Sequence, residues 1–154
     1  MIDAPRLLRE EEAAWRSIGE GFGLIPDARF EEPSLTPEGW SPKDAMFHVA
    51  GWTDDCARQL DRMRLGSFVA AEETRETIER QNRAWFEVSY GMDPAEVRSR
   101  FADSRRRMVD AFTALVVALG EATPEAAEWF EESGALHYAK HVDDLRSFVE
   151  AVSA

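Results

Sequence analysis

The amino-acid sequence predicts an all-α protein, an up-and-down four-helix bundle with a short extra helix between its second and third long helices. Apolar side chains recur every three or four residues over several segments, which is the spacing of one helix face. Most of these segments are bounded by residues that begin or end helices. No stretch shows the alternation and frequent turns that a strand-rich fold requires. At 154 residues the chain can bury one core, and we expect residues 1–154 to form a single domain.

The first expected helix covers an apolar repeat near the N-terminus and ends at a glycine cluster. Its apolar positions are Leu7, Leu8, Ala14, Trp15, Ile18 and Phe22. Glycine and proline are poor helix formers, so Gly19, Gly21 and Gly23, followed by Pro26, are expected to end it. Residues 24–40 contain three prolines and are expected to form a connection.

The second expected helix has clear signals at both ends. Ser41 is a good N-cap, Pro42 suits the first helical position, and Asp44 stands where a capping box places its acidic residue. Gly66 is expected to end the helix. His48 falls on the same inward face as the apolar residues. These are Ala45, Val49, Trp52, Cys56, Leu60 and Met63.

The second half of the chain predicts three further helical segments. Residues 74–88 indicate the extra helix. Asp93 is the expected N-cap of a long helix that continues to Gly120. The last helix begins either at Pro124 or after Gly134 and runs almost to the end of the sequence. Its inward positions include His137, His141, Leu145, Phe148 and Val152.

Composition excludes several classes of partner. The formal net charge of -12 would repel nucleic acids and anionic membranes, so we expect neither as a partner. The one dense basic segment, Arg105–Arg107, is interpreted as a solvated helix face. Cys56 is the only cysteine and is expected to be buried; an intrachain disulfide is excluded, which suits a reducing compartment. The sequence begins without a signal-peptide pattern, and we expect a cytoplasmic protein.

The three histidines are the strongest chemical signal in the sequence. His137 and His141 are four residues apart, so their side chains share one helix face. His48 would add a third imidazole from another inward face. Three histidines can bind one zinc ion and leave a coordination position open, and imidazole also suits nickel, iron and copper. The alternative is that all three are hydrogen-bonded packing residues, and the spacing alone leaves both interpretations open.

Residues near these histidines are candidates for supporting roles. Ligating histidines usually donate their second ring N–H to a carboxylate or carbonyl, and Asp44, Asp55 and Asp144, each one or two helical turns from a histidine, are the candidates. Asp144 is also a candidate fourth ligand or catalytic proton acceptor. Trp52 and Tyr138 are candidates to line a pocket. Solvent exposure would explain the three aspartates equally well, and core packing would explain Trp52.

Three segments carry a resemblance to a known family. The segments are GWSPKDAMFHVAGW (Gly39–Trp52), HYAKHVDDLRSF (His137–Phe148) and RQNRAWFE (Arg80–Glu87). The first two resemble the histidine motifs of the DinB-like superfamily, which includes the mycothiol-dependent maleylpyruvate isomerase N-terminal domain and the bacillithiol transferases. The third is similar to the middle of the ClbS/DfsB-like branch.

The resemblance implies a four-helix bundle in which His48, His137 and His141 bind one divalent metal ion, zinc or nickel, with iron as a further choice. It also implies a homodimer, a small-molecule substrate and, in some members, a low-molecular-weight thiol as cosubstrate. The sequence ends soon after the last expected helix. We therefore expect it to lack the additional C-terminal domain of the isomerases, which disfavours isomerase activity.

These observations leave three functional hypotheses. The first is a metal-dependent thiol S-transferase, or a hydrolase if water replaces the thiol. The second is a non-catalytic protein that binds a small molecule in a metal-dependent way and protects against stress. The third is a protein in which the metal ion has only a structural role and links two helices. An enzyme needs a pocket that reaches an open coordination position, whereas a structural site is closed by a fourth protein ligand.

Overall fold

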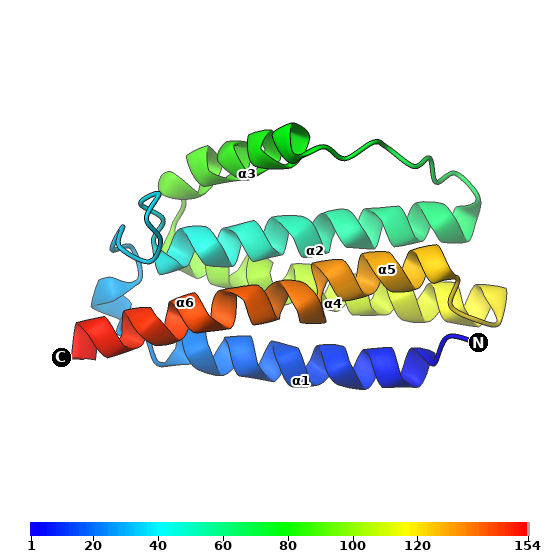
Figure 1. Cartoon of the computed structure of the whole chain (residues 1–154), viewed down its shortest axis with the longest axis horizontal. Helices are drawn as coiled ribbons and strands as arrows, with labels where there is room; N and C mark the ends of the chain where they lie inside the picture. The colour runs from blue at the N-terminus through cyan, green and yellow to red at the C-terminus, as the bar shows by residue number, and fades with distance from the viewer. Residues whose placement is uncertain (154) are drawn as a thin grey trace.

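The computed structural model describes residues 1–153 and is all-helical, with no strand in that range. The elements are α1 (Ala4–Gly23), η1 (Asp27–Arg29), α2 (Pro42–Leu65), α3 (Arg75–Tyr90), α4 (Pro94–Leu119), α5 (Pro124–Ser133) and α6 (Ala135–Ser153). Helix η1 is a single 3-10 turn. Figure 1 shows α1, α2, α4 and the α5–α6 pair lying along the long axis of the molecule, with α3 outside α2. The predicted all-α class is confirmed.

The predicted helix ends are formed by the residues that signalled them. The Ser41 hydroxyl accepts the Asp44 backbone N–H at 3.1 Å, and Asp44 Oδ2 accepts the Ser41 N–H at 2.9 Å, which completes the capping box. Gly66 and Gly120 end α2 and α4 with φ of 76° and 80°, a conformation that glycine adopts without steric cost.

The structure refines two expected helix boundaries. Helix α1 continues through Gly19 and Gly21 and ends only at Gly23. A Cβ at Gly21 would lie 3.3 Å from Leu145 Cδ1, so the glycine lets α1 and α6 approach closely. The last helix begins at both expected places, because Gly134 divides it into α5 and α6. A Cβ at Gly134 would lie 2.8 Å from the Phe130 carbonyl oxygen.

One hydrophobic core is formed by side chains from α1, α2, α4, α5 and α6. Helices α2 and α4 pack along their length, while α1 packs mainly on α6. The extra helix α3 differs, because its only buried residue is Ser89. It is held on α2 by half-buried aromatic contacts, with Trp85 edge-on to Trp52 and Phe86 stacked on Trp40. Helix α3 is therefore an outer layer over α2.

The interpretation of Arg105–Arg107 as a solvated face is wrong for Arg105. Its guanidinium group makes a two-pronged ion pair with Glu11, whose side chain is 1 % exposed, across the contact between α4 and α1. Arg106 and Arg107 do remain near solvent, where they pair with Asp103 and Asp54. No helix in residues 1–153 is long and apolar enough to cross a membrane.

Candidate metal centre

The three histidines come from two helices that face each other across the interior. His48 lies in the first half of α2, and its ring packs 4.9 Å from the Trp40 ring that precedes the helix. His137 lies in the first turn of α6, directly after the Gly134 break, and His141 follows one turn later. The capped start of α2 and the glycine between α5 and α6 therefore set the positions of all three rings.

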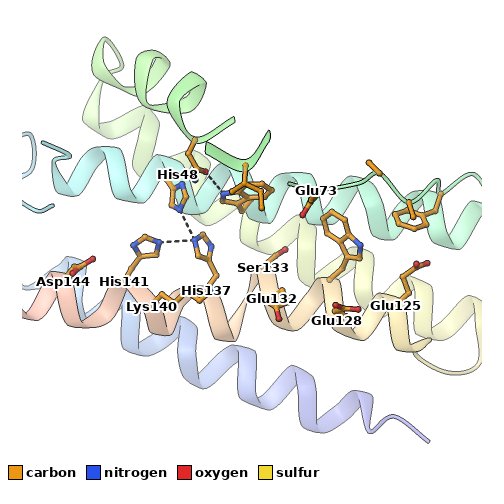
Figure 2. A pocket seen from close by; sticks show the side chains of 17 residues that line it. His48, Glu73, Glu125, Glu128, Glu132, Ser133, His137, Lys140, His141 and Asp144 are labelled. Atoms are coloured by element: carbon orange, nitrogen blue, oxygen red, sulfur yellow. Dashed lines mark hydrogen bonds between the residues drawn. The ribbon is translucent and has the colours of Figure 1, made fainter. Parts of the chain in front are cut away.

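The imidazoles converge on one point. His137 Nε2 lies 2.9 Å from His48 Nε2 and 3.0 Å from His141 Nε2, and all three candidate ligand atoms lie within 4.8 Å of one another. Figure 2 shows the rings directed toward a common centre from α2 and α6. Two nitrogens bound to one tetrahedral zinc ion are about 3.3 Å apart. The nitrogens therefore need to move only slightly to share an ion.

The surroundings of the site keep all three imidazoles neutral. Burial lowers the pKa of His48 to about 3; the nearby His141 adds to the effect, and Asn82 opposes it. Burial lowers the pKa of His137 well below its usual value, with further contributions from the two other histidines and Lys140. Burial also lowers the pKa of His141, although Asp144 acts in the opposite direction. Neutral imidazole is the form that binds metal ions.

The Nδ1 atoms of His48 and His137 do not have the carboxylate partners that the sequence suggested. Nδ1 of His48 and Nδ1 of His137 are buried and have no hydrogen-bond partner within residues 1–153. Asp44 is instead used by the capping box and by the Ser89 hydroxyl, which donates to Asp44 Oδ1 at 2.6 Å. Asp55 accepts hydrogen bonds from its neighbours on α2. The prediction that Asp44 or Asp55 orients His48 is therefore wrong.

A cavity of about 640 Å³ opens onto the histidines. It lies between α2, the segment joining α2 to α3, α3, α5 and α6, and all three histidines line it. Its wall is partly aromatic, with Trp52, Phe68 and Trp129. Volumes of roughly 300–1,000 Å³ are usual for small-molecule sites. The three histidines therefore lie at the inner end of a space that can hold a ligand.

The structure separates the remaining predicted site residues into two groups. Trp52 lines the cavity as expected and donates its indole N–H to Asn82 at 2.9 Å, and Asp144 lines the cavity as well. The prediction that Tyr138 lines the pocket is wrong, because its fully buried hydroxyl donates to Glu11 at 2.9 Å. Cys56 is buried and donates weakly to the Trp129 carbonyl, as a structural cysteine would.

Sequence reasoning missed most of the cavity wall. Glu125, Glu128 and Glu132 of α5 line the cavity, as do Glu73 and Lys140. The spacing of the three α5 glutamates, three and then four residues, places them on one helix face, so the pattern was visible in the sequence. What the sequence did not reveal is that this face borders the histidines rather than open solvent.

The donor set fits a divalent metal ion. It consists of three neutral imidazoles whose Nε2 atoms converge, and the buried Nδ1 atoms of His48 and His137 have no partner in the described residues, which is costly. Within residues 1–153 this is the one group of histidine, cysteine or acidic residues close enough to hold an ion, and it includes no carboxylate. Asp144 therefore is not part of this group, although it lines the same cavity.

The fold and the site define an all-helical protein with a candidate tri-histidine metal centre at the inner end of a cavity. The chain matches the sequence model of the mycothiol maleylpyruvate isomerase N-terminal domain over residues 11–129, and it belongs to this family of the DinB-like superfamily. The predicted family is thus confirmed. The match includes His48 but ends before His137 and His141. No curated protein and no solved structure matches the chain.

Proposed function

We propose that this protein is a metal-dependent transferase that activates a low-molecular-weight thiol, with hydrolysis as the outcome when water takes the thiol's place. The observation that carries the proposal is that all three converging histidines line the cavity. A metal that only tied helices together would have no need for such access, because structural sites are closed by protein ligands. Membership of the family is consistent with a metal-binding role.

The chain's own residues supply distinct parts of this chemistry. His48, His137 and His141 would hold one divalent ion, zinc or nickel in the first instance and iron as a further choice. Such an ion lowers the pKa of a bound thiol or water, which makes the nucleophile available at neutral pH. Trp52 would pack against the substrate, because it forms part of the cavity wall.

Asp144 is the candidate proton acceptor. Its carboxylate lines the cavity beside His141 and takes part in no ion pair within residues 1–153. In the transfer, the thiol sulfur bonds to an electrophilic carbon and the displaced group leaves with the electrons of its former bond. The thiol proton passes to an Asp144 carboxylate oxygen. Cys56 does not serve as the nucleophile, because burial raises the pKa of its thiol to about 12.

The second candidate function is a protein that binds a small molecule with the help of the metal but does not convert it. The partly aromatic cavity supports this candidate as well, since it would retain a ligand without any chemistry. The two candidates differ in turnover. Repeated product formation in excess of protein would favour the transferase, whereas saturable binding with unchanged ligand would favour the binding protein.

Three further parts of the proposal concern architecture, assembly and location. We take α1, α2, α4 and the α5–α6 pair as the four arms of an up-and-down bundle that forms a single domain. This follows from their common core and from α3 standing outside it. We also propose a cytoplasmic homodimer, as the resemblance implies. Light scattering of the purified protein would test the dimer directly.

The experiment that tests the metal site is elemental analysis of protein purified without a nickel column. We expect about one zinc, nickel or iron per chain. His48→Ala and the His137→Ala/His141→Ala double variant should each lose it. Asp143→Ala is the matched control on α6, because Asp143 is exposed and lies outside the cavity. Metal-free wild-type protein that stays empty after zinc, nickel and iron are added would overturn the proposal.

A further inference from the structure

The cavity next to the histidines has a strongly acidic wall. Its acidic residues are Glu73, Glu125, Glu128, Glu132 and Asp144. Lys140 is the single lysine or arginine among the lining residues. Figure 2 shows the three α5 glutamates following one another along the helix, away from the imidazoles. A ligand in this space would therefore meet an excess of negative charge, most of it beyond the metal centre.

These carboxylates lack the arginine partners that many acidic residues have elsewhere on the molecule. None of the five takes part in an ion pair or side-chain hydrogen bond in the part of the chain that the structure describes, and neither does Lys140. On other surfaces acidic groups pair with arginine, as in Arg16–Glu12 at 3.0 Å and Arg58–Asp54 at 2.7 Å. The pKa of Glu73 is raised, mainly by partial burial and further by the charge of Asp55.

The arrangement of the carboxylates does not suit a second metal ion. A metal requires ligand atoms that converge within a few ångströms. Among residues 1–153 only the histidines meet that condition. The carboxylates are instead spread along the cavity wall, so they suit a cation that is large or that approaches them one at a time.

Aromatic side chains stand among the carboxylates. Trp129 lies between Glu128 and Glu132 in sequence and lines the same cavity, and the Phe68 ring meets it edge-on at 6.4 Å. Trp52 provides a third aromatic surface nearer the histidines. Organic ammonium groups bind well where aromatic faces and carboxylates occur together. The aromatic wall also gives an apolar molecular body a place to pack.

The volume of the cavity, about 640 Å³, also marks this space as a ligand site, and the metal centre lies at its inner end. His137 lines the cavity, is 9 % exposed, and leaves its Nδ1 without a hydrogen-bond partner in the described residues. We propose that the cavity binds an organic cation with an apolar body, whose ammonium group lies beside Glu125, Glu128 and Glu132 and whose other end faces the histidines. This inference rests on the proposed function, because it names the substrate class of that same site.

The test compares probes that share one body and differ in charge. 4-Phenylbutylamine, 4-phenylbutanol and 4-phenylbutyrate present a cation, a neutral group and an anion on the same apolar frame. We expect calorimetry to show that the amine binds roughly tenfold or more tightly than the carboxylate, with the alcohol between them. Butylamine, which lacks the ring, should bind more weakly than phenylbutylamine. Equal affinities, or tighter binding of the carboxylate, would overturn the proposal.

A pair of charge-matched variants separates local recognition from the overall charge. Glu125→Gln/Glu128→Gln/Glu132→Gln should reduce the preference for the amine by roughly tenfold. The control is Glu20→Gln/Glu38→Gln/Glu121→Gln, which removes the same charge from exposed residues outside the cavity. It should leave the preference within about twofold of wild type, because distant exposed charges are screened by salt. Equal losses in both triple variants would show that only net charge matters and would overturn the inference.

Metal content measured on the same preparations distinguishes failure of this inference from failure of the proposed function. Protein that contains metal but does not discriminate between the probes would retain the metal-dependent function and lose the substrate class. Protein without metal that still prefers the amine, and loses the preference in the α5 triple variant, would retain the cation site and lose the proposed chemistry.

Discussion

Two buried polar clusters meet α6 at adjacent residues, and they are built differently. In the first, Glu11 of α1 accepts hydrogen bonds from Arg105 of α4 and from the Tyr138 hydroxyl. In the second, His48 and His137 face each other with their Nδ1 atoms unpartnered within residues 1–153. The glutamate cluster is satisfied by protein groups alone. The histidine cluster is not, although both lie in the same interior.

This difference separates a structural cluster from a candidate functional one. Hydrogen bonds compensate the desolvation of Glu11, so the glutamate cluster can hold α1, α4 and α6 together without any added component. The histidines retain a desolvation cost that an external ligand would relieve. The comparison therefore leads us to expect that changes to the first cluster alter stability, whereas changes to the second alter metal binding.

The largest effect is expected for Glu11→Ala. It leaves Arg105 and the Tyr138 hydroxyl without their acceptor, and removing one partner of a buried ion pair costs about 3–5 kcal/mol. Urea unfolding would measure the loss. The control is Glu12→Ala, since Glu12 is exposed and pairs only with Arg16, and its effect should stay below about 1 kcal/mol. Similar losses in both variants would contradict a structural role for this cluster.

The next effect concerns metal and should appear only in the histidine cluster. Zinc at about 100 times its dissociation constant should stabilise the wild-type protein by about 2.7 kcal/mol. His141→Ala should abolish this gain, whereas Glu11→Gln should preserve it, because Glu11 is not part of the histidine group. Thermal unfolding with and without zinc would measure both. If zinc stabilised His141→Ala as much as the wild-type protein, His141 would not be a metal ligand.

A smaller effect should follow from pH in the metal-free protein. The pKa of His48 is about 3 in the folded state and near 6.5 when unfolded, so above pH 6.5 both states are neutral and nothing changes. As pH falls below 6.5 the unfolded state takes up the proton first, and stability decreases until about pH 3. Between pH 7 and about pH 5.5, His48 alone should account for about 1.4 kcal/mol.

Urea titrations at the two pH values would measure this loss. His48→Gln removes the ionisable group from both states, so the same pH change should cost the variant about 1.4 kcal/mol less. An identical loss in wild type and variant would mean that His48 is accessible to protons in the folded protein.

The smallest effect is expected for Tyr138→Phe. It removes one hydrogen bond to Glu11 but leaves the bidentate Arg105 pair in place, so the loss should be about 1 kcal/mol. Metal stoichiometry should not change, even though the neighbouring residue is His137. Loss of metal in this variant would show that the two clusters act as one and would contradict their separation.

The sequence was a good guide wherever a local signal controls the structure. The Ser41 capping box and the αL glycines at 66 and 120 act through neighbouring backbone groups, so the ends of α2 and α4 were predictable. Helix α1 ends at Gly23, within the glycine cluster that was expected to end it, and it passes through Gly21 where α6 packs closely.

The candidate site was predictable in its ligands but not in its surroundings. The spacing of His137 and His141 and the inward position of His48 suffice to suggest convergence. Tyr138 was assigned to the same pocket, yet a helix turns about 100° per residue, and that rotation carries its ring to Glu11. Asp44 was predicted to orient His48, but its carboxylate instead accepts the Ser41 backbone N–H in the capping box.

The sequence by itself therefore determined the all-α class, the caps that begin and end the long helices, and the three histidines on inward faces. These features depend on periodicity and on contacts within a few residues of one chain segment. Only the tertiary structure decided that α5 and the segment before α3 meet beside the histidines and enclose an acidic, aromatic cavity. That result depends on how helices distant in sequence pack together, and no local pattern encodes which exposed carboxylates will line the same cavity.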